Sequence, residues 1–183
     1  MYAPFLFLSK FFTQPLFNAS IWPTDDKVAQ EICKSVNWKD KKVILELGPG
    51  TGPITKHILN YMDKDAVYYG IEYDSDYLSI LRKEHHGDNI HFVQGNVRDI
   101  EHIVAKLIGA GNIDVIISTL PYKPFVDYPH ALDRIKNCAN RGTQFRGISY
   151  SPFIFKKVYK RLNPKVVFFS WKNIPPIYII GVH

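Results

Sequence analysis

The sequence has few of the residues that build disulfides, metal sites or membrane spans. Its 183 residues include only two cysteines, Cys33 and Cys138, and these lack the spacing of a metal or redox site. We therefore expect buried thiols in a reducing compartment, and no bound metal. No uninterrupted apolar run reaches the ~18 residues of a membrane-spanning helix. The start of the chain also lacks the features of a signal peptide, so we expect a cytoplasmic protein, either soluble or bound to a membrane surface.

The chain is basic and rich in aromatic residues. It has 23 Lys and Arg against 17 Asp and Glu, a formal net charge of +6, and 14% aromatic residues. Positive charge favours anionic partners, which are nucleic acid or an anionic lipid surface, but does not choose between them. The length predicts one domain that can bury its own core.

A glycine-rich turn between a predicted strand and a predicted helix carries most of the information. The short apolar run Val43–Leu47 is typical of a buried strand, and the segment Thr51–Tyr61 has apolar residues at helical spacing. Gly48, Gly50 and Gly52 lie at the junction, where the backbone must take positive φ or lie against a ligand. A strand, a glycine turn and a helix in this order hold a nucleotide-like ligand at the carboxyl edge of a parallel sheet.

Glu46 separates two interpretations of this turn. A dinucleotide-binding loop has the spacing Gly-x-Gly-x-x-Gly and holds a pyrophosphate, which a carboxylate would repel. Here the spacing is Gly-x-Gly-x-Gly, and a carboxylate suits a ligand with an amino group and a sulfonium. Residues 46–52, Glu-Leu-Gly-Pro-Gly-Thr-Gly, resemble motif I of class I S-adenosylmethionine-dependent methyltransferases. The resemblance implies S-adenosylmethionine as cofactor, held by Glu46 and the three glycines; the alternative is a turn that only joins two elements.

Further polar residues follow the next two predicted strands. Glu72 ends the run Val67–Ile71, and an acidic residue about 20 residues after the glycine turn can accept hydrogen bonds from both ribose hydroxyls. Asn96 and Val97 follow the strand Ile90–Val93. In the fold that the resemblance implies, the residue at position 96 caps the adenine amino group and is commonly Asp; Asn keeps an acceptor oxygen. Singly these residues would be surface residues, but as a series at strand ends they indicate a cofactor site.

The pattern of elements predicts an α/β protein. Further helices are predicted from Thr24, as N-cap, to about Val36, and over Asp127–Ala139 and Pro152–Leu162; further strands are predicted over Ile113–Ser118, Thr143–Ile148, Val166–Trp171 and Ile177–Val182. The alternation predicts a mostly parallel sheet flanked by helices. The resemblance implies a Rossmann-like class I methyltransferase fold, with seven strands and an antiparallel last strand. Residues 24–183 would form this domain, after an aromatic-rich segment at 1–23.

The residues after the fourth predicted strand bear on the methyl acceptor. Adenine N6-methyltransferases carry Asn or Asp, then Pro-Pro or Leu-Pro, then an aromatic residue. Thr119 occupies the Asn or Asp position, which weakens the case for adenine. Ser118-Thr119-Leu120-Pro121 instead resembles the Ser-Gly-Leu-Pro motif of bacterial phospholipid N-methyltransferases, although that family often has Gly at position 119 and an aliphatic residue at position 122. Segments at 7–16, 21–24, 144–145, 151–152 and 171–176 also resemble this family.

The resemblance implies N-methylation of a phosphatidylethanolamine-type phospholipid at an anionic membrane surface. The backbone carbonyls of Ser118 and Leu120, with the ring of Tyr122, would orient the amine as catalytic groups. The segment Phe5–Phe12 would lie in the membrane interface and the basic helix around Lys156 would attract headgroups; a buried helix and a solvated helix face are the alternatives. Two other functions stay open: an RNA or DNA adenine N6-methyltransferase, for which nucleic acid is the less expected partner, and a non-catalytic membrane-associated protein.

Overall fold

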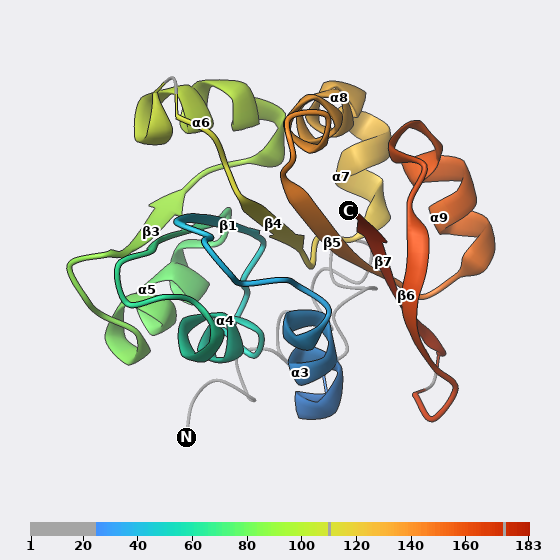
Figure 1. Cartoon of the computed structure of the whole chain (residues 1–183), viewed down its shortest axis with the longest axis horizontal. Coiled ribbons are helices and arrows are strands. Elements are labelled where there is room, and N and C mark those ends of the chain that lie inside the picture. The colour runs from blue at the N-terminus through green and yellow to red at the C-terminus, as the bar shows by residue number, and fades with distance from the viewer. Residues whose placement is uncertain (1–24, 110, 174) are drawn as a thin grey trace.

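The computed structural model describes residues 25–109, 111–173 and 175–183. The predicted N-terminal segment 1–23 and the predicted cap Thr24 lie outside the described residues. Within this part, one sheet runs through the molecule and helices cover both of its faces (Figure 1).

The sheet has seven strands in the order β3-β2-β1-β4-β5-β7-β6. The strands β1 to β5 are mutually parallel, and β7 is antiparallel to both of its neighbours, β5 and β6. The predicted α/β class and the mostly parallel seven-stranded sheet with an antiparallel last strand are confirmed. The strands are β1 (Val43–Leu47), β2 (Val67–Glu72), β3 (Ile90–Gln94), β4 (Val115–Ser118), β5 (Gln144–Ser149), β6 (Lys165–Ser170) and β7 (Ile177–Val182).

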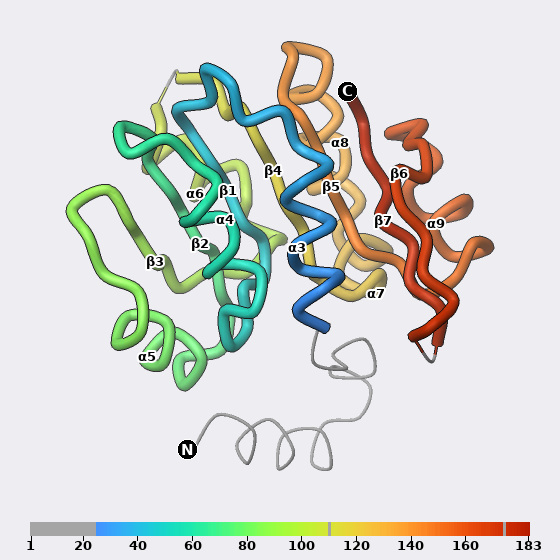
Figure 2. Tube along the Cα trace, turned by 60° about the horizontal axis from the view of Figure 1, so that its bottom comes forward, coloured from blue at the N-terminus to red at the C-terminus, as the bar shows by residue number. Residues whose placement is uncertain are grey.

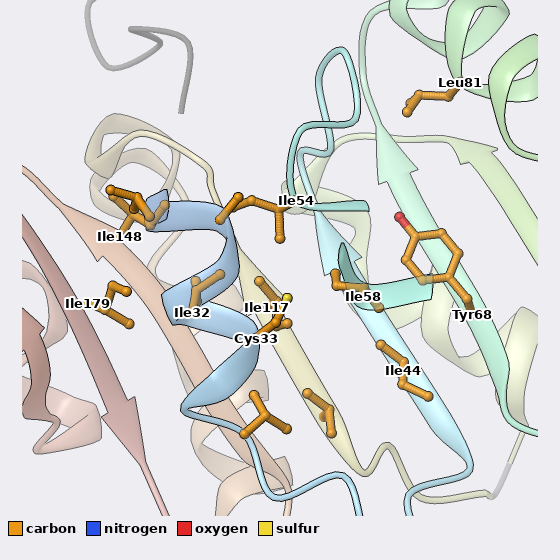
Figure 3. Packing of buried hydrophobic residues seen from close by; sticks show 14 of the residues in the cluster. Ile32, Cys33, Ile44, Ile54, Ile58, Tyr68, Leu81, Ile117, Ile148 and Ile179 are labelled. Carbon is orange, nitrogen blue, oxygen red and sulfur yellow. The ribbon is translucent and has the colours of Figure 1, made fainter. Parts of the chain in front are cut away.

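Two layers of helices enclose the sheet because its central strands are apolar on both faces. One layer holds α3 (Asp26–Lys34), α4 (Thr55–Tyr61) and α5 (Ser75–Glu84), which pack on the sheet through the residues of Figure 3. The opposite layer holds α6 (Ile100–Ile108), α7 (Tyr122–Asp127), α8 (Pro129–Ala139) and α9 (Pro152–Val158), with two 3-10 turns, η1 (Val97–Asp99) and η2 (Tyr159–Leu162). Cys33 and Cys138 are buried free thiols, one in each core layer, as predicted.

Three predicted helix boundaries are wrong, each for a local reason. The helix α3 is capped by Asp25, whose carboxylate accepts a hydrogen bond from the Lys27 backbone N–H. The helix after the glycine turn begins at Thr55 rather than Thr51, because Gly52 has a φ of 85° and turns fill the interval. The predicted helix Asp127–Ala139 is α8, which begins at Pro129 rather than Asp127 because Tyr128, with a φ of −128°, precedes a proline; Asp127 ends the separate helix α7.

The sheet order reverses beside β1, and this point of the carboxyl edge is where the crevice for a ligand is expected. From β1 the chain moves outward to β2 and β3, and then returns to form β4 on the other side of β1. Ligands of open α/β sheets bind outside the carboxyl ends of the strands, where the strand order reverses in this way. Figure 2 shows these ends along one edge of the molecule.

Candidate cofactor and methyl-transfer site

The glycine turn after β1 is built from residues that need positive φ. Gly48, Gly50 and Gly52 have φ values of 75°, 60° and 85°, a region that L side chains rarely adopt. A Cβ on Gly50 would meet no atom within 4 Å, whereas a Cβ on Gly48 would lie 2.6 Å from a Leu120 methyl carbon. The turn is therefore open at Gly50 and closed at Gly48, where the residues after β4 lie against it.

Glu72 ties this turn to the end of β2. Its Oε2 accepts a hydrogen bond from the Gly50 backbone N–H at 2.9 Å, and its Oε1 accepts one from Asp74 N–H at 2.9 Å. Burial raises the pKa of Glu72, while these N–H donors act in the opposite direction. The carboxylate predicted to hold a ribose thus lies directly beside the glycine turn.

Glu46 is a fully buried carboxylate with one oxygen paired. Its Oε2 accepts hydrogen bonds from the Tyr68 hydroxyl at 2.6 Å and the Thr55 hydroxyl at 2.8 Å. Its Oε1 is buried and has no hydrogen-bond partner among the described residues. Burial raises the pKa of Glu46 to about 7; the two hydroxyls lower it and the charge of Glu72 raises it. A buried oxygen without a partner calls for a donor from a ligand, and a cationic one would favour the ionised form.

Thr55 and Tyr68 were not predicted as site residues. Tyr68 belongs to the buried face of β2 beside β1, and Figure 3 places it among the residues of this core. In the sequence, Tyr68 stands out only as a hydroxyl-bearing side chain within an apolar strand, the strand that follows the one with the motif carboxylate. Such a signal identifies a partner for Glu46 only once the register of β1 and β2 is known.

Asn96 and Val97 reach the same edge through β3. The Gly95 backbone N–H donates to the Glu72 carbonyl at 2.9 Å, which places the start of η1 beside the end of β2. The Asn96 carboxamide oxygen accepts a hydrogen bond from Arg98 N–H at 3.0 Å, and Val97 is buried. Asn96 therefore caps the 3-10 turn with the oxygen that was predicted to meet the adenine, and keeps a second lone pair on it.

The residues after β4 lie on the other side of the glycine turn. Thr119 N–H donates to the Leu47 carbonyl at 3.1 Å, and the Thr119 hydroxyl donates to the Gly48 carbonyl. Ser118 is buried and its hydroxyl has no hydrogen-bond partner in the described part of the chain. Tyr122 begins α7 and is exposed. The structure thus brings the predicted acceptor residues against the predicted cofactor residues at one crevice.

A family model described as ribosomal RNA adenine dimethylase matches residues 19–135. The chain belongs to this family. It is a class I S-adenosylmethionine-dependent methyltransferase, in line with both the fold and the resemblance of its glycine motif. Its cofactor is S-adenosylmethionine.

Two relatives and one solved structure place this methyltransferase among known proteins. An ornithine lipid N-methyltransferase of Singulisphaera acidiphila is 32% identical over 179 residues, which are 94% of this chain and 91% of that protein. A ribosomal RNA small subunit methyltransferase A of Mycoplasma capricolum is 30% identical over 101 residues, 54% of this chain and 36% of that protein. The structure of M. capricolum TrmK with S-adenosyl-homocysteine has a TM-score of 0.61 at 12% identity, covering 85% of this chain and 66% of that one.

The residues at the crevice fit S-adenosylmethionine. The unpaired Glu46 oxygen suits the ammonium group of the methionine portion, the open position at Gly50 leaves room for the ligand, and Glu72 suits the ribose hydroxyls. When bound, S-adenosylmethionine supplies an electrophilic methyl group on a sulfonium leaving group. The protein then has to hold a neutral nucleophile in line with that methyl group and exclude water, which is mainly positioning.

Two adjacent histidines lie between α5 and β3, near this site. Of His85 and His86, only His86 is exposed. His85 is partly buried, its Nε2 lies 3.0 Å from where a Cβ on Gly52 would be, and burial lowers its pKa. Both histidines also line a surface groove of about 610 Å³ beside β3, the end strand of the sheet. His85 therefore supports the glycine turn of this methyltransferase from the α5 side.

Asp127 and His130 have the partners of helix-surface residues. Lys123 Nζ lies 2.7 Å from Asp127, and His130 Nε2 lies 2.6 Å from the Arg98 carbonyl oxygen. No group of His, Cys, Asp and Glu within the described ranges could hold a metal ion. No helix in the same ranges is long and apolar enough to cross a membrane.

Proposed function

We propose that the protein transfers a methyl group from S-adenosylmethionine to the amine of a phosphatidylethanolamine-type phospholipid at a membrane surface. The observation that carries this proposal is the hydrogen bond made by the Thr119 hydroxyl. Its hydroxyl donates to the Gly48 carbonyl, so it serves the glycine turn. The position therefore offers no carboxamide or carboxylate to accept the hydrogens of an adenine amino group. Similarity to a lipid N-methyltransferase along 94% of the chain supports the same conclusion.

A lipid amine places modest demands on the acceptor residues. The headgroup nitrogen must lose a proton and approach the methyl group along one line. The backbone carbonyls of Ser118 and Leu120 would orient it, and the ring of Tyr122 would stabilise the positive charge that grows on nitrogen during transfer. Desolvation in the crevice favours the neutral amine as the nucleophile.

Methylation of ribosomal RNA adenine is the second candidate. The family model and the Mycoplasma capricolum relative favour it, and Leu120, Pro121 and Tyr122 fit the adenine pattern apart from Thr119. The chain spans about a third of the length of this RNA-methylating relative.

Labelled S-adenosylmethionine tests the two candidates directly. The full chain is incubated with vesicles containing phosphatidylethanolamine, with a water-soluble short-chain form of the same lipid, and with small-subunit ribosomal RNA. We expect label on the lipid nitrogen in both lipid samples and none in RNA. Label in N6-methyladenine without label in lipid would replace the proposal with the second candidate.

A further inference from the structure

Large apolar side chains are exposed at the carboxyl edge, beside the proposed acceptor site. Phe153 is 83% exposed, Trp171 74%, Val126 57% and Tyr122 45%. Val126 and Tyr122 lie on α7, which follows β4, and Phe153 lies in the first turn of α9, which follows β5. Trp171 follows the last residue of β6, which runs parallel to β5 because β7 is antiparallel to both. We call these four residues the apolar rim.

Contacts between aromatic rings connect the elements that carry this rim. Tyr178 of β7 packs against Phe155 of α9 at a centroid distance of 5.9 Å, and against Phe169 of β6 at 4.8 Å. Phe125 of α7 packs against Tyr159, which directly follows α9, at a centroid distance of 5.5 Å. The elements that carry the rim are therefore anchored to one another by ring contacts, in which Phe169 is exposed and the other rings are buried or partly buried, while the rim residues themselves stay exposed. Figure 2 shows α7, the end of β6 and the start of β7 along this edge.

The charge around the rim has one sign. Residues 134–183 contain ten Lys and Arg and no Asp or Glu. Lys156 and Lys157 share α9 with Phe153, and Lys172 follows Trp171; all three are exposed. None of these three lysines forms an ion pair with a described residue, whereas Arg161 pairs with Asp133 at 2.8 Å. Exposed aromatic side chains flanked by unpaired lysines suit a surface that is apolar inside and anionic outside.

We propose that the apolar rim docks on an anionic lipid bilayer. Phe153 and Trp171 enter the interface between headgroups and acyl chains, and Lys156, Lys157 and Lys172 contact lipid phosphates. The candidate site beside Gly50 then faces the membrane surface. Val126 favours a bilayer over RNA, because an aliphatic side chain gains from acyl chains and offers no ring for a base to stack on. The role of the rim in catalysis rests on the proposed lipid substrate; the docking itself does not.

Vesicle binding by the full chain tests the aromatic part of the rim. The probe is vesicles of phosphatidylethanolamine and phosphatidylglycerol, and the variant carries Phe153→Ser and Trp171→Ser. We expect at least about a tenfold loss of vesicle affinity, because a loss of 1.4 kcal/mol is tenfold and two aromatic side chains bury more than that. The matched control, Val166→Ser with Val167→Ser, removes two exposed apolar side chains from the edge strand β6 and should bind as the wild type does.

Substitution of the neighbouring lysines tests the contribution of positive charge to docking. Lys156→Gln with Lys157→Gln should weaken binding to these vesicles by roughly fivefold for each lysine at low salt, and leave the weak binding to neutral vesicles unchanged. Lys39→Gln with Lys64→Gln removes the same charge from exposed loops at the amino edge and should have little effect. Acyl-chain-brominated lipids should also quench a tryptophan signal that Trp171→Phe removes.

The possible results of these experiments distinguish membrane docking from the identity of the substrate. Docking is overturned if the wild type ignores these vesicles, if the rim variants bind them as well as the wild type does, or if the rim substitutions weaken RNA binding instead. Methylation of the short-chain lipid should survive Phe153→Ser with Trp171→Ser, which also shows that this variant folds. If rim substitutions abolish vesicle binding but the wild type methylates neither form of the lipid, docking stands and the proposed function fails.

Discussion

Glu46 links the stability of the fold to the protonation of one buried carboxyl group. A carboxyl group with an ordinary pKa of 4.5 is held at about 7 by burial, while one of its oxygens has no partner among the described residues. The folded protein therefore binds this proton more tightly than the unfolded chain does. The stability contributed by Glu46 is present below pH 4.5 and is lost as the pH rises to 7, by about 3 kcal/mol for this shift.

Replacement of Glu46 by Gln should weaken cofactor binding and make the fold more stable. Without cofactor, the variant should melt at a higher temperature than the wild type at pH 8 and show little gain at pH 4.5. In the wild type, affinity for S-adenosylmethionine should rise from pH 6 to pH 8, because the cation binds the ionised carboxylate. Calorimetric titration in buffers of different ionisation enthalpy should detect proton release that the variant lacks. Identical pH profiles for the two proteins would show that Glu46 does not meet the cofactor.

Gly142, which also has positive φ, is a matched control for a substitution of Gly50. Gly50 and Gly142 have φ values of 60° and 96°, and a Cβ on either would meet no atom within 4 Å. Substitution by Val should cost each protein at least roughly 1–2 kcal/mol of unfolding free energy, because both residues adopt positive φ. Only Gly50→Val should lose S-adenosylmethionine affinity, since Gly142 lies before β5 at the opposite edge. Equal affinities in both variants, measured by calorimetry, would place the cofactor elsewhere.

Glu72 offers a milder test of the same site. Glu72→Ala removes the acceptor next to the glycine turn. It should weaken the binding of S-adenosylmethionine by roughly 1.5–3 kcal/mol, the value of a hydrogen bond to a charged group. Glu72→Gln keeps an acceptor oxygen and should lose less. Unchanged affinity in the Ala variant would remove Glu72 from the cofactor site.

At the scale of elements, strands were predicted more closely than helices. The bounds of β1 and β7 agree with the prediction, because short β-branched runs between polar segments mark strands directly. The helix boundaries depend on single residues that set φ, such as Gly52 and the residue before Pro129, and helical periodicity does not report those. The pairing of Glu46 with Thr55 and Tyr68 depends on three elements at once, so no local pattern could predict it.

The cap of α3 gives a test at this scale. The helix packs four buried residues on the central strands, and Asp25 holds its first turn. Asp25→Ala should lower the free energy of unfolding by about 1 kcal/mol, whereas Asp25→Asn keeps the acceptor and should cost much less. Urea denaturation measures both, and neither should change cofactor affinity. A loss of similar size in the Asn variant would mean that charge rather than the cap hydrogen bond stabilises the helix.

For the whole molecule, topology explains why the residues of the candidate cofactor site could be grouped from the sequence and those of the apolar rim could not. Every predicted cofactor residue lies at or just after the carboxyl end of a parallel strand, and such strands end at one edge, so sequence order alone gathers Glu46, Glu72 and Asn96 there. The apolar rim joins residues after β4, β5 and β6. Its assembly depends on β7 entering between β5 and β6, a strand order that the sequence does not specify.

The N-terminal segment extends the docking prediction to the full chain. Phe5, Phe7, Phe11 and Phe12 fall within the first 18 residues, and interfacial binding scales with buried apolar area plus attraction to anionic lipid. Removal of residues 1–18 should therefore weaken vesicle binding and lipid methylation while sparing S-adenosylmethionine affinity. Binding that remains should come from the apolar rim and its lysines, and should fade at high salt because exposed charges are screened over about 10 Å at 0.1 M. Co-sedimentation with anionic and neutral vesicles at two salt concentrations measures both contributions. A truncated protein that binds as well as the full chain would leave the rim as the whole membrane contact and exclude an interfacial role for the first 18 residues.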